Sequence, residues 1–146
     1  MAANVIATAE LFLDTAYAIA LSSPRDSFHP QAVLLADEIA AKSTKLITTQ
    51  AVLLEIGNAL ASPKYRQKAA LLLQALSADS RVEVVPLTDM LYEQAFNLFR
   101  DHTDKAWGIT DCISFIVIRE RNLTEALTAD HYFEQAGFRA LLRDLR

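Results

Sequence analysis

The segment that most constrains the fold is Cys112 to Ile118, in which Ser114 is the only polar side chain. A helix through this segment has apolar residues on every side and offers no face to solvent before Arg119. Such a helix must be covered by other parts of the chain. We therefore predict a central, buried helix that begins close to Asp111.

Short β-prone runs alternate along the chain with longer segments of helical character. The runs are Leu11 to Leu13, Leu46 to Thr49, Val82 to Val85 and Glu125 to Ala129. This alternation is typical of α/β proteins with a mostly parallel sheet. Thr88 is expected to cap a helix, and Gly137 to end a short turn in the left-handed conformation. Residues 138–142 are then a candidate edge strand.

Composition restricts the class of protein further. The chain has 146 residues, of which 52% are hydrophobic and 22% charged, so we expect a single globular domain over residues 1–146. It contains no apolar run of about 18 residues that would span a bilayer. No basic residue precedes Arg25, so the start lacks the pattern of a secretion signal, and a lone Cys112 forms no internal disulfide. These features predict a soluble, cytoplasmic protein without a membrane segment.

Four acidic residues occupy places where an isolated charge is costly. Asp14 ends the run L-F-L-D, and Asp130 ends A-L-T-A-D. Glu55 is the only charged residue between Gln50 and Ala61, and Asp111 stands at the entrance to the apolar helix. Ligands bind beyond the carboxyl ends of parallel strands, so these acids are candidates for one shared site.

Each of these acids also has a purely structural explanation. Asp111, or its neighbour Thr110, is suited to cap the apolar helix. Asp14 and Asp130 are ordinary turn residues after strands. Glu55 fits a half-exposed position at the edge of a helix.

A divalent cation would reconcile four carboxylates in one place, since without it they repel one another and hold protons at neutral pH. Oxygen ligands favour Mg²⁺ or Mn²⁺, and the sequence has no paired His or Cys spacing for zinc. The three histidines, His29, His102 and His131, stand singly in polar contexts and are expected at the surface.

Four blocks of the sequence carry a family resemblance over essentially the whole chain. They are L-F-L-D-T, L-L-E-I-G-N, W-G-I-T-D-C-I-S-F and L-T-A-D-H-Y-F-E-Q-A-G-F. Together they resemble PIN-domain proteins, and the VapC-type toxin ribonucleases in particular. The resemblance implies a three-layer α/β/α sandwich around a mostly parallel sheet of about five strands.

The resemblance also implies which residues form the site. Asp14, Glu55, Asp111 and Asp130 match the family's acidic quartet, which implies that they are the catalytic residues and the metal ligands. Asp104 matches a position that is often acidic, although a surface charge paired with Lys105 is the alternative. Asn58 and Thr110 match polar positions that would orient the carboxylates. Tyr17 departs from the small polar residue that many relatives have.

The activity implied is Mg²⁺- or Mn²⁺-dependent hydrolysis of RNA, in which a metal-activated water attacks the phosphodiester. Relatives of this type are commonly homodimers that a small antitoxin protein inhibits, so the same partners are expected here. The alternative is a non-catalytic PIN-like module that acts by binding protein or RNA. The intact acidic positions argue against that alternative.

The formal net charge of −4 is unusual for a nucleic-acid enzyme until the four acids are set aside. Then 14 of the 18 acidic residues remain against 14 basic ones. Candidates for phosphate contact lie in S-P-K-Y-R-Q-K, where Lys64, Arg66 and Lys68 surround Tyr65. The alternative is a solvated helix start. Trp107 is similarly either a buried anchor for its loop or a platform for a base.

Overall fold

The computed structural model describes residues 4–144. At its centre is a sheet of five strands in the order β3-β2-β1-β4-β5, and every neighbouring pair is parallel. The strands are β1 (Glu10–Leu13), β2 (Lys45–Thr49), β3 (Val82–Val85), β4 (Glu125–Leu127) and β5 (Arg139–Ala140). All four predicted runs form strands at or within two residues of the expected bounds.

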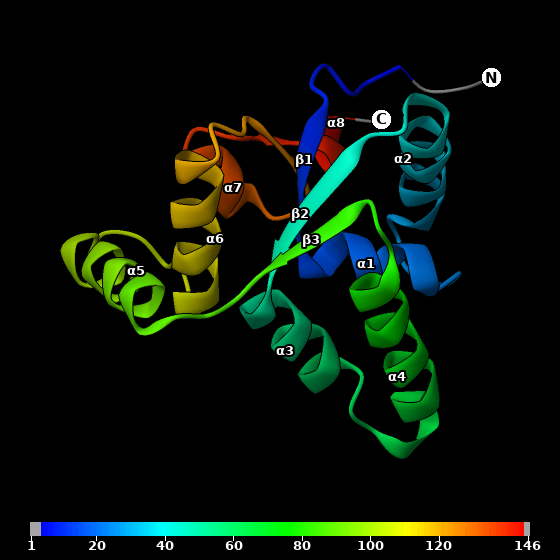
Figure 1. The fold of residues 1–146 in the computed structure, drawn as a ribbon, viewed down its shortest axis with the longest axis horizontal. Helices are drawn as coiled ribbons and strands as arrows, with labels where there is room; N and C mark the ends of the chain where they lie inside the picture. The colour runs from blue at the N-terminus through cyan, green and yellow to red at the C-terminus, as the bar shows by residue number, and fades with distance from the viewer. Residues whose placement is uncertain (1–3, 145–146) are drawn as a thin grey trace.

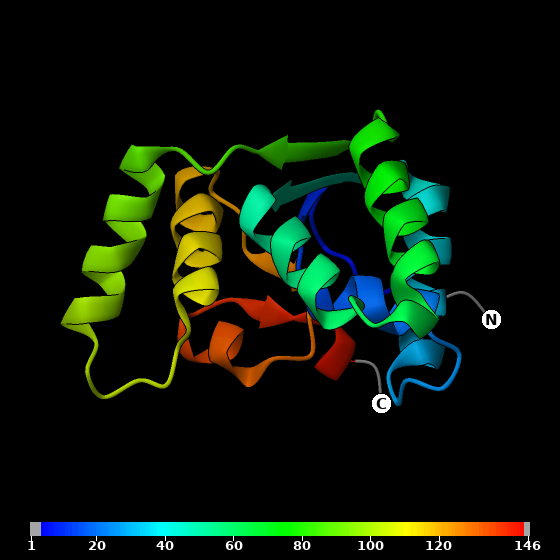
Figure 2. The same cartoon turned by 90° about the horizontal axis from the view of Figure 1, so that it is seen from below.

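Helices cover both faces of the sheet, as expected for a three-layer α/β/α sandwich (Figures 1 and 2). They are α1 (Thr15–Ser22), α2 (His29–Lys42), α3 (Gln50–Ala59), α4 (Pro63–Ala78), α5 (Asp89–Asp101), α6 (Ile109–Glu120), α7 (His131–Gln135) and α8 (Leu141–Asp144). Figure 1 shows α5, α6 and α7 on one side of the sheet and α1, α2 and α4 on the other. The predicted fold class is therefore confirmed.

Helix α6 is the central helix that its apolar sequence predicted. Cys112, Phe115 and Ile118 are fully buried, because the helix packs between the sheet and the outer helix α5. The ring of Phe115 makes edge contacts with Trp107 and Phe133, at 5.0 Å between ring centroids in each case. Trp107 is buried and donates to Gln135 at 3.0 Å, so it anchors the loop before α6.

Local signals at the ends of elements were correct in two places. Thr88 caps α5 by accepting a hydrogen bond from the Leu91 amide at 3.1 Å. Gly137 has a φ of 98°, a conformation that favours glycine.

The expectation of an edge strand over residues 138–142 was wrong for most of its length. Only Arg139 and Ala140 pair with β4, and Leu141 begins α8. Leu141 and Leu142 are fully buried. An apolar pair of this kind is buried in either conformation, so its hydrophobicity does not distinguish strand from helix.

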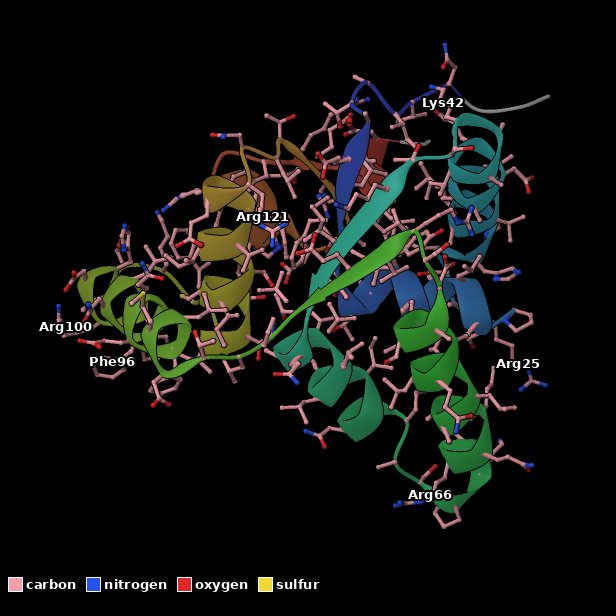
Figure 3. All side chains as sticks on the ribbon, viewed as in Figure 1. Arg25, Lys42, Arg66, Phe96, Arg100 and Arg121 are labelled. Carbon is pink, nitrogen blue, oxygen red and sulfur yellow. The ribbon has the colours of Figure 1, made fainter. Side chains whose placement is uncertain are left out.

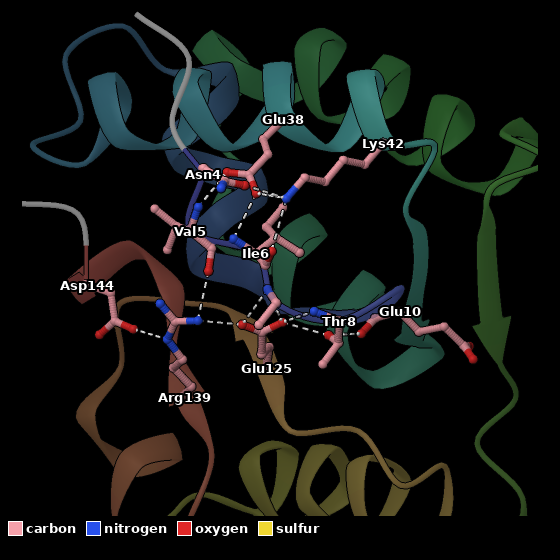
Figure 4. Close-up of polar contacts among 11 residues, drawn as sticks. Asn4, Val5, Ile6, Thr8, Glu10, Glu38, Lys42, Glu125, Arg139 and Asp144 are labelled. Carbon is pink, nitrogen blue, oxygen red and sulfur yellow. Dashed lines mark hydrogen bonds and ion pairs between the residues drawn. The ribbon is translucent and has the colours of Figure 1, made fainter.

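At the amino end of the sheet, two buried glutamates, Glu38 of α2 and Glu125 of β4, bind the N-terminal segment, residues 5–8 (Figure 4). We call this pair of glutamates the clamp. Glu38, 3% exposed, accepts hydrogen bonds from the Val5 and Ile6 amides at 2.8 Å and from Lys42 at 2.7 Å. Glu125, 2% exposed, sits at the start of β4 and has its own set of donors. They are the Ala7 and Thr8 amides, the Thr8 hydroxyl and Arg139.

Arg139 joins three parts of the chain at this clamp. Besides Glu125, it donates to the Val5 carbonyl at 2.8 Å and to the Asp144 carboxylate of α8. Among residues 4–144 there is no helix long and apolar enough to cross a membrane.

Candidate active site

Four carboxylates come together at the carboxyl end of the sheet. Asp14 directly follows the central strand β1, and Asp130 lies just beyond the neighbouring strand β4. Glu55 comes from α3, which follows β2 on the other side of β1, and Asp111 lies in the first turn of α6. The parallel order β2-β1-β4 therefore delivers acids from both neighbours of β1 to one place.

The electrostatics show that these acids act on one another. The charges of Glu55 and Asp111 contribute to raising the pKa of Asp14, and those of Asp130 and Glu55 contribute to raising the pKa of Asp111. Each of the four is thus coupled to at least one other. The structural explanation also holds in part, because Asp130 caps α7 by accepting a hydrogen bond from the Tyr132 amide at 2.9 Å. Capping alone does not account for the electrostatic coupling among the four acids.

Asp14 is the most deeply buried of the four, with 6% of its surface exposed. Burial raises the pKa of its carboxyl from 3.8 to about 7, and the neighbouring negative charges add to this effect. Hydrogen bonds from the Thr128 hydroxyl, at 2.8 Å, and from the Thr15 backbone oppose the shift only in part. Near neutral pH this carboxyl therefore holds a proton for much of the time unless a positive charge is nearby.

Asp111 serves both the helix and the cluster. Its Oδ2 accepts a hydrogen bond from the Gly108 amide at 2.9 Å, so the carboxylate satisfies a free N–H at the start of α6. Gly108, not Thr110, is the residue at the N-cap position. Burial raises the pKa of Asp111 to about 6 despite this bond, and the charges of Asp130 and Glu55 act in the same direction.

Threonine hydroxyls orient the cluster. Thr128, fully buried, donates to Asp14 and accepts from the Asp130 amide at 3.1 Å, which links two of the acids through one hydroxyl. Thr15 donates to Oε1 of Glu55. Sequence reasoning missed both threonines, although each lies within two residues of a predicted site acid and that proximity was the available signal.

The other predicted polar residues lie around the cluster or away from it. Asn58 is exposed on α3, three residues after Glu55. The Thr110 side chain is half-buried and, within residues 4–144, donates to none of the four carboxylates. Asp104 has 70% of its side chain exposed and pairs with Lys105 at 3.0 Å, as its alternative explanation predicted. Lys64 and Arg66 are exposed on α4.

Of the three histidines, His131 approaches one of the four acids, and the other two bind backbone carbonyls. His29 and His102 form ring hydrogen bonds with the carbonyls of Ala20 and Leu98. His131 is exposed, with its Nδ1 3.9 Å from a carboxylate oxygen of Asp130.

The donor set fits a hard divalent cation. Among residues 4–144, no three His, Cys, Asp or Glu side chains already form a metal-binding group. The four coupled acids, however, offer only oxygen atoms, which Mg²⁺ and Mn²⁺ prefer. Burial together with the neighbouring negative charges raises the pKa of Asp14 and Asp111, and no lysine or arginine is among the causes that act on either carboxyl in the described residues.

Comparison with known proteins gives consistent results. The family model of the PIN domain matches residues 11–139. The chain is 30% identical over 128 residues to the 23S rRNA-specific endonuclease VapC20 of Mycobacterium tuberculosis, an alignment that covers 88% of this chain and 95% of that protein.

Solved structures show the same fold. The crystal structure of M. tuberculosis VapC20, described as a sarcin-ricin loop cleaving toxin, matches with a TM-score of 0.78 at 29% identity, over 88% of this chain and 95% of that one. VapBC2 from Rickettsia felis, bound to a DNA fragment from its promoter, matches with a TM-score of 0.64 at 15% identity, over 90% and 96% of the two chains. The extent of the family match and the identity to VapC20 show that this chain belongs to the PIN-domain family, as its four sequence blocks predicted.

Proposed function

We propose that this protein is a Mg²⁺- or Mn²⁺-dependent endoribonuclease and the toxin of a type II toxin–antitoxin pair. The observation that carries the proposal is the coupled cluster of Asp14, Glu55, Asp111 and Asp130 at the carboxyl end of the sheet. The relative that is 30% identical over most of both chains is named as an endonuclease specific for 23S rRNA. Ribosomal RNA is therefore the first substrate to test.

The four acids would hold the cation through their carboxylate oxygens. A bound Mg²⁺ or Mn²⁺ supplies Lewis acidity, which activates water and stabilises negative charge on the phosphodiester. The chain's own contribution is to fix the ligands: Thr128 orients Asp14, and the Gly108 amide orients Asp111. Because burial favours the protonated forms of these two acids, proton release accompanies the binding of a cation.

Glu55 is placed to accept a proton. Thr15 holds its Oε1, whereas Oε2 has no hydrogen-bond partner in the part of the chain that the structure describes. We assign Oε2 the role of general base that receives a proton from the attacking water. Water is the nucleophile in this proposal, and no side chain attacks the phosphodiester. Helix α3 packs against α1, and the charge of Glu55 is close enough to Asp14 to raise its pKa.

The proposal is tested by incubating the purified protein with fragments of ribosomal RNA and transfer RNA, in Mg²⁺, Mn²⁺ or EDTA, and mapping the new ends. Cleavage is expected only with a divalent cation, and Asp14→Asn and Asp111→Asn each lower it by about a thousandfold or more. The matched control is Asp101→Asn, since Asp101 is an exposed acid in a surface pair with Arg100. Cleavage that survives both site variants would refute the proposal.

Partners follow from the same proposal. An antitoxin protein would inhibit the enzyme, the active form would be a homodimer, and the site of action would be the cytoplasm, where ribosomes are. Light scattering of the purified protein tests the dimer. Coexpression with the product of a neighbouring gene, followed by the RNA assay, tests the antitoxin.

A further inference from the structure

The lysines and arginines differ in whether a carboxylate already neutralises their charge. In the described part of the chain, eight lysine and arginine side chains pair with carboxylates at 4.0 Å or less. Within residues 4–144, the lysines and arginines without a carboxylate partner are Arg25, Lys64, Arg66, Lys68 and Arg119. Three of these five lie within five residues of one another, in the first turns of α4.

The surroundings of these three cations lack negative charge. From Ile56 to Ala78 the chain has no Asp or Glu, in a protein whose formal net charge is −4. This stretch covers the end of α3, the loop after it and all of α4. No acidic residue lies in the first turn of α4, so the positive end of the helix dipole adds to the charges of the side chains.

An exposed aromatic ring stands among the cations. Tyr65 is 43% exposed, and the ammonium group of Lys64 lies 5.4 Å from the centre of its ring. On a helix of 3.6 residues per turn, Lys64 and Lys68 share one face and Arg66 lies on the other side of Tyr65. The ring is thus flanked by positive charge on both sides. This combination suits a nucleic acid with unpaired bases, because the phosphates pair with cations and the bases stack on aromatic rings.

Helix α3 connects the basic residues at the start of α4 to the four acids. Glu55 lies four residues before the end of α3, about 6 Å of helical rise, and α4 packs against α3. Figure 3 shows Arg66 at the outer tip of α4, where the α3–α4 pair projects from the body of the molecule. An RNA strand bound at this tip can therefore continue along α3 to the acids.

We propose that the basic start of α4, formed by Lys64, Tyr65, Arg66 and Lys68, is the surface that binds the RNA substrate and selects an unpaired segment. The inference rests on the proposed function. It adds that recognition occurs at a place separate from the four acids. An acidic protein segment would also be attracted to the three cations. Its binding would not require the exposed ring of Tyr65 between them, whereas an unpaired base stacks on such a ring.

The test measures RNA binding in EDTA, so that its result does not depend on cleavage. The probes are a hairpin RNA with an unpaired loop and a blunt RNA duplex, each measured by fluorescence anisotropy over a range of salt concentrations. The triple variant Lys64→Gln, Arg66→Gln, Lys68→Gln is compared with Lys45→Gln, Arg81→Gln, Arg100→Gln, which removes the same charge from paired surface positions.

The α4 triple variant is expected to bind the hairpin about tenfold or more weakly, and the slope of log affinity against log salt falls by about 2, since each phosphate contact to a single strand contributes about 0.7. The control triple variant keeps the slope of the unmodified protein. Tyr65→Leu lowers affinity for the hairpin by about five- to one-hundredfold and leaves affinity for the duplex unchanged. In Mg²⁺, the α4 triple variant raises KM and leaves kcat nearly unchanged.

Several outcomes would overturn the inference. Equal losses in the two triple variants would mean that only total charge matters. Unchanged hairpin binding in the α4 triple variant, with lost binding to a poly-glutamate peptide, would assign the surface to a protein partner. If hairpin binding depends on α4 but no RNA is cleaved with any cation, the proposed function fails and the binding surface stands.

Discussion

Buried acids lie at both ends of the central sheet, and they differ in what surrounds them. At the amino end, Glu38 and Glu125 are fully supplied with hydrogen-bond donors and each is paired with a cation. At the carboxyl end, Asp14 and Asp111 have few donors and face other acids. Glu38 and Asp14 have similar exposed fractions, 3% and 6%, but Asp14 is surrounded by much more protein, so its carboxylate loses more of its hydration. Exposed surface alone therefore does not separate a structural acid from a candidate site acid.

Glu38 and Asp14 also differ in the direction of their pKa shifts. Burial acts to raise the pKa of Glu38, but hydrogen bonds from Lys42, Val5 and Ile6 outweigh it and hold this pKa below its usual value. For Asp14 the loss of hydration on burial is the largest effect, and the hydrogen bonds from Thr128 and Thr15 are too few to outweigh it, so its pKa stays high. An acid whose donors are complete stabilises the fold, whereas an acid left short of positive charge is available to a ligand.

The largest effect is expected at the amino end. Glu125→Ala removes the carboxylate that accepts hydrogen bonds from the Ala7 and Thr8 amides and from Arg139, so these donors lose their partner. We expect a loss of about 3–5 kcal/mol in the free energy of unfolding, measured in urea by circular dichroism. The control is Glu93→Ala on the exposed face of α5, which should change this free energy by less than about 0.5 kcal/mol. Equal losses of unfolding free energy in the two variants would show that the hydrogen bonds of Glu125 stabilise the fold no more than an exposed glutamate does.

The opposite sign is expected at the carboxyl end. Asp14→Asn keeps an acceptor for Thr128 but removes the charge, so in EDTA at pH 8 it should stabilise the fold by about 2–4 kcal/mol. The same variant is inactive under the proposed function. Urea unfolding of the two proteins at several pH values gives the comparison.

The pH dependence of the free energy of unfolding tests whether the gain in Asp14→Asn comes from the removed charge. Asp14 binds its proton with a pKa of about 7 in the folded protein and near 3.8 when unfolded, so the folded state holds more protons between these values. The unmodified protein therefore loses stability as the pH rises from about 4 to about 7, and Asp14→Asn lacks this loss. The two curves should meet near pH 4 and separate above it. Glu38 acts in the other direction, since its contribution is lost as the pH falls. An Asn variant that is less stable at pH 8 would mean that the charge of Asp14 is already compensated.

A divalent cation should compensate the negative charge of the acids at the carboxyl end of the sheet and thereby stabilise the fold. At 100 times its dissociation constant, Mg²⁺ or Mn²⁺ is expected to raise the free energy of unfolding by about 2.7 kcal/mol at pH 8, because it binds the folded site. Thermal unfolding with increasing metal measures this gain. Asp14→Asn should gain much less, and Glu93→Ala as much as the unmodified protein. The same gain in all three would place the metal elsewhere.

The smallest effect is expected at Asp104. This acid is exposed, paired with Lys105 and outside the coupled cluster, so Asp104→Asn should keep RNA cleavage within about twofold and stability within about 0.5 kcal/mol. Initial rates in Mg²⁺ check it, with Asp111→Asn as the contrasting variant. A large loss of cleavage would extend the site to this loop.

The positions of Asp14 and Asp130 at the carboxyl end of the sheet were predictable from the sequence, whereas their catalytic role stays a prediction. Strand exits followed by Asp14 and Asp130, and a lone acid in an apolar helix, are local patterns, and parallel topology brings such positions together. The apolar helix α6 was predicted for the same reason, since its burial follows from composition alone.

The amino end could not be predicted in this way. Glu125 stands in a β-prone run, and its partners Ala7 and Thr8 are backbone amides more than 100 residues away in the sequence. Glu38 resembles an ordinary surface partner of Lys42 one helical turn later. Backbone donors belong to every residue, so no residue type marks them, and only the folded chain shows where they converge.

Arg139 contacts the Val5 carbonyl and the Asp144 carboxylate, so the beginning and the end of the described chain are held together at the amino end of the sheet, opposite to the end with the four acids. Circular permutation becomes practicable as a result. A short linker between these two points and a new opening in an exposed loop would preserve the order of strands in space while changing it along the chain. Reporter domains attached at either point would likewise project away from the four carboxylates.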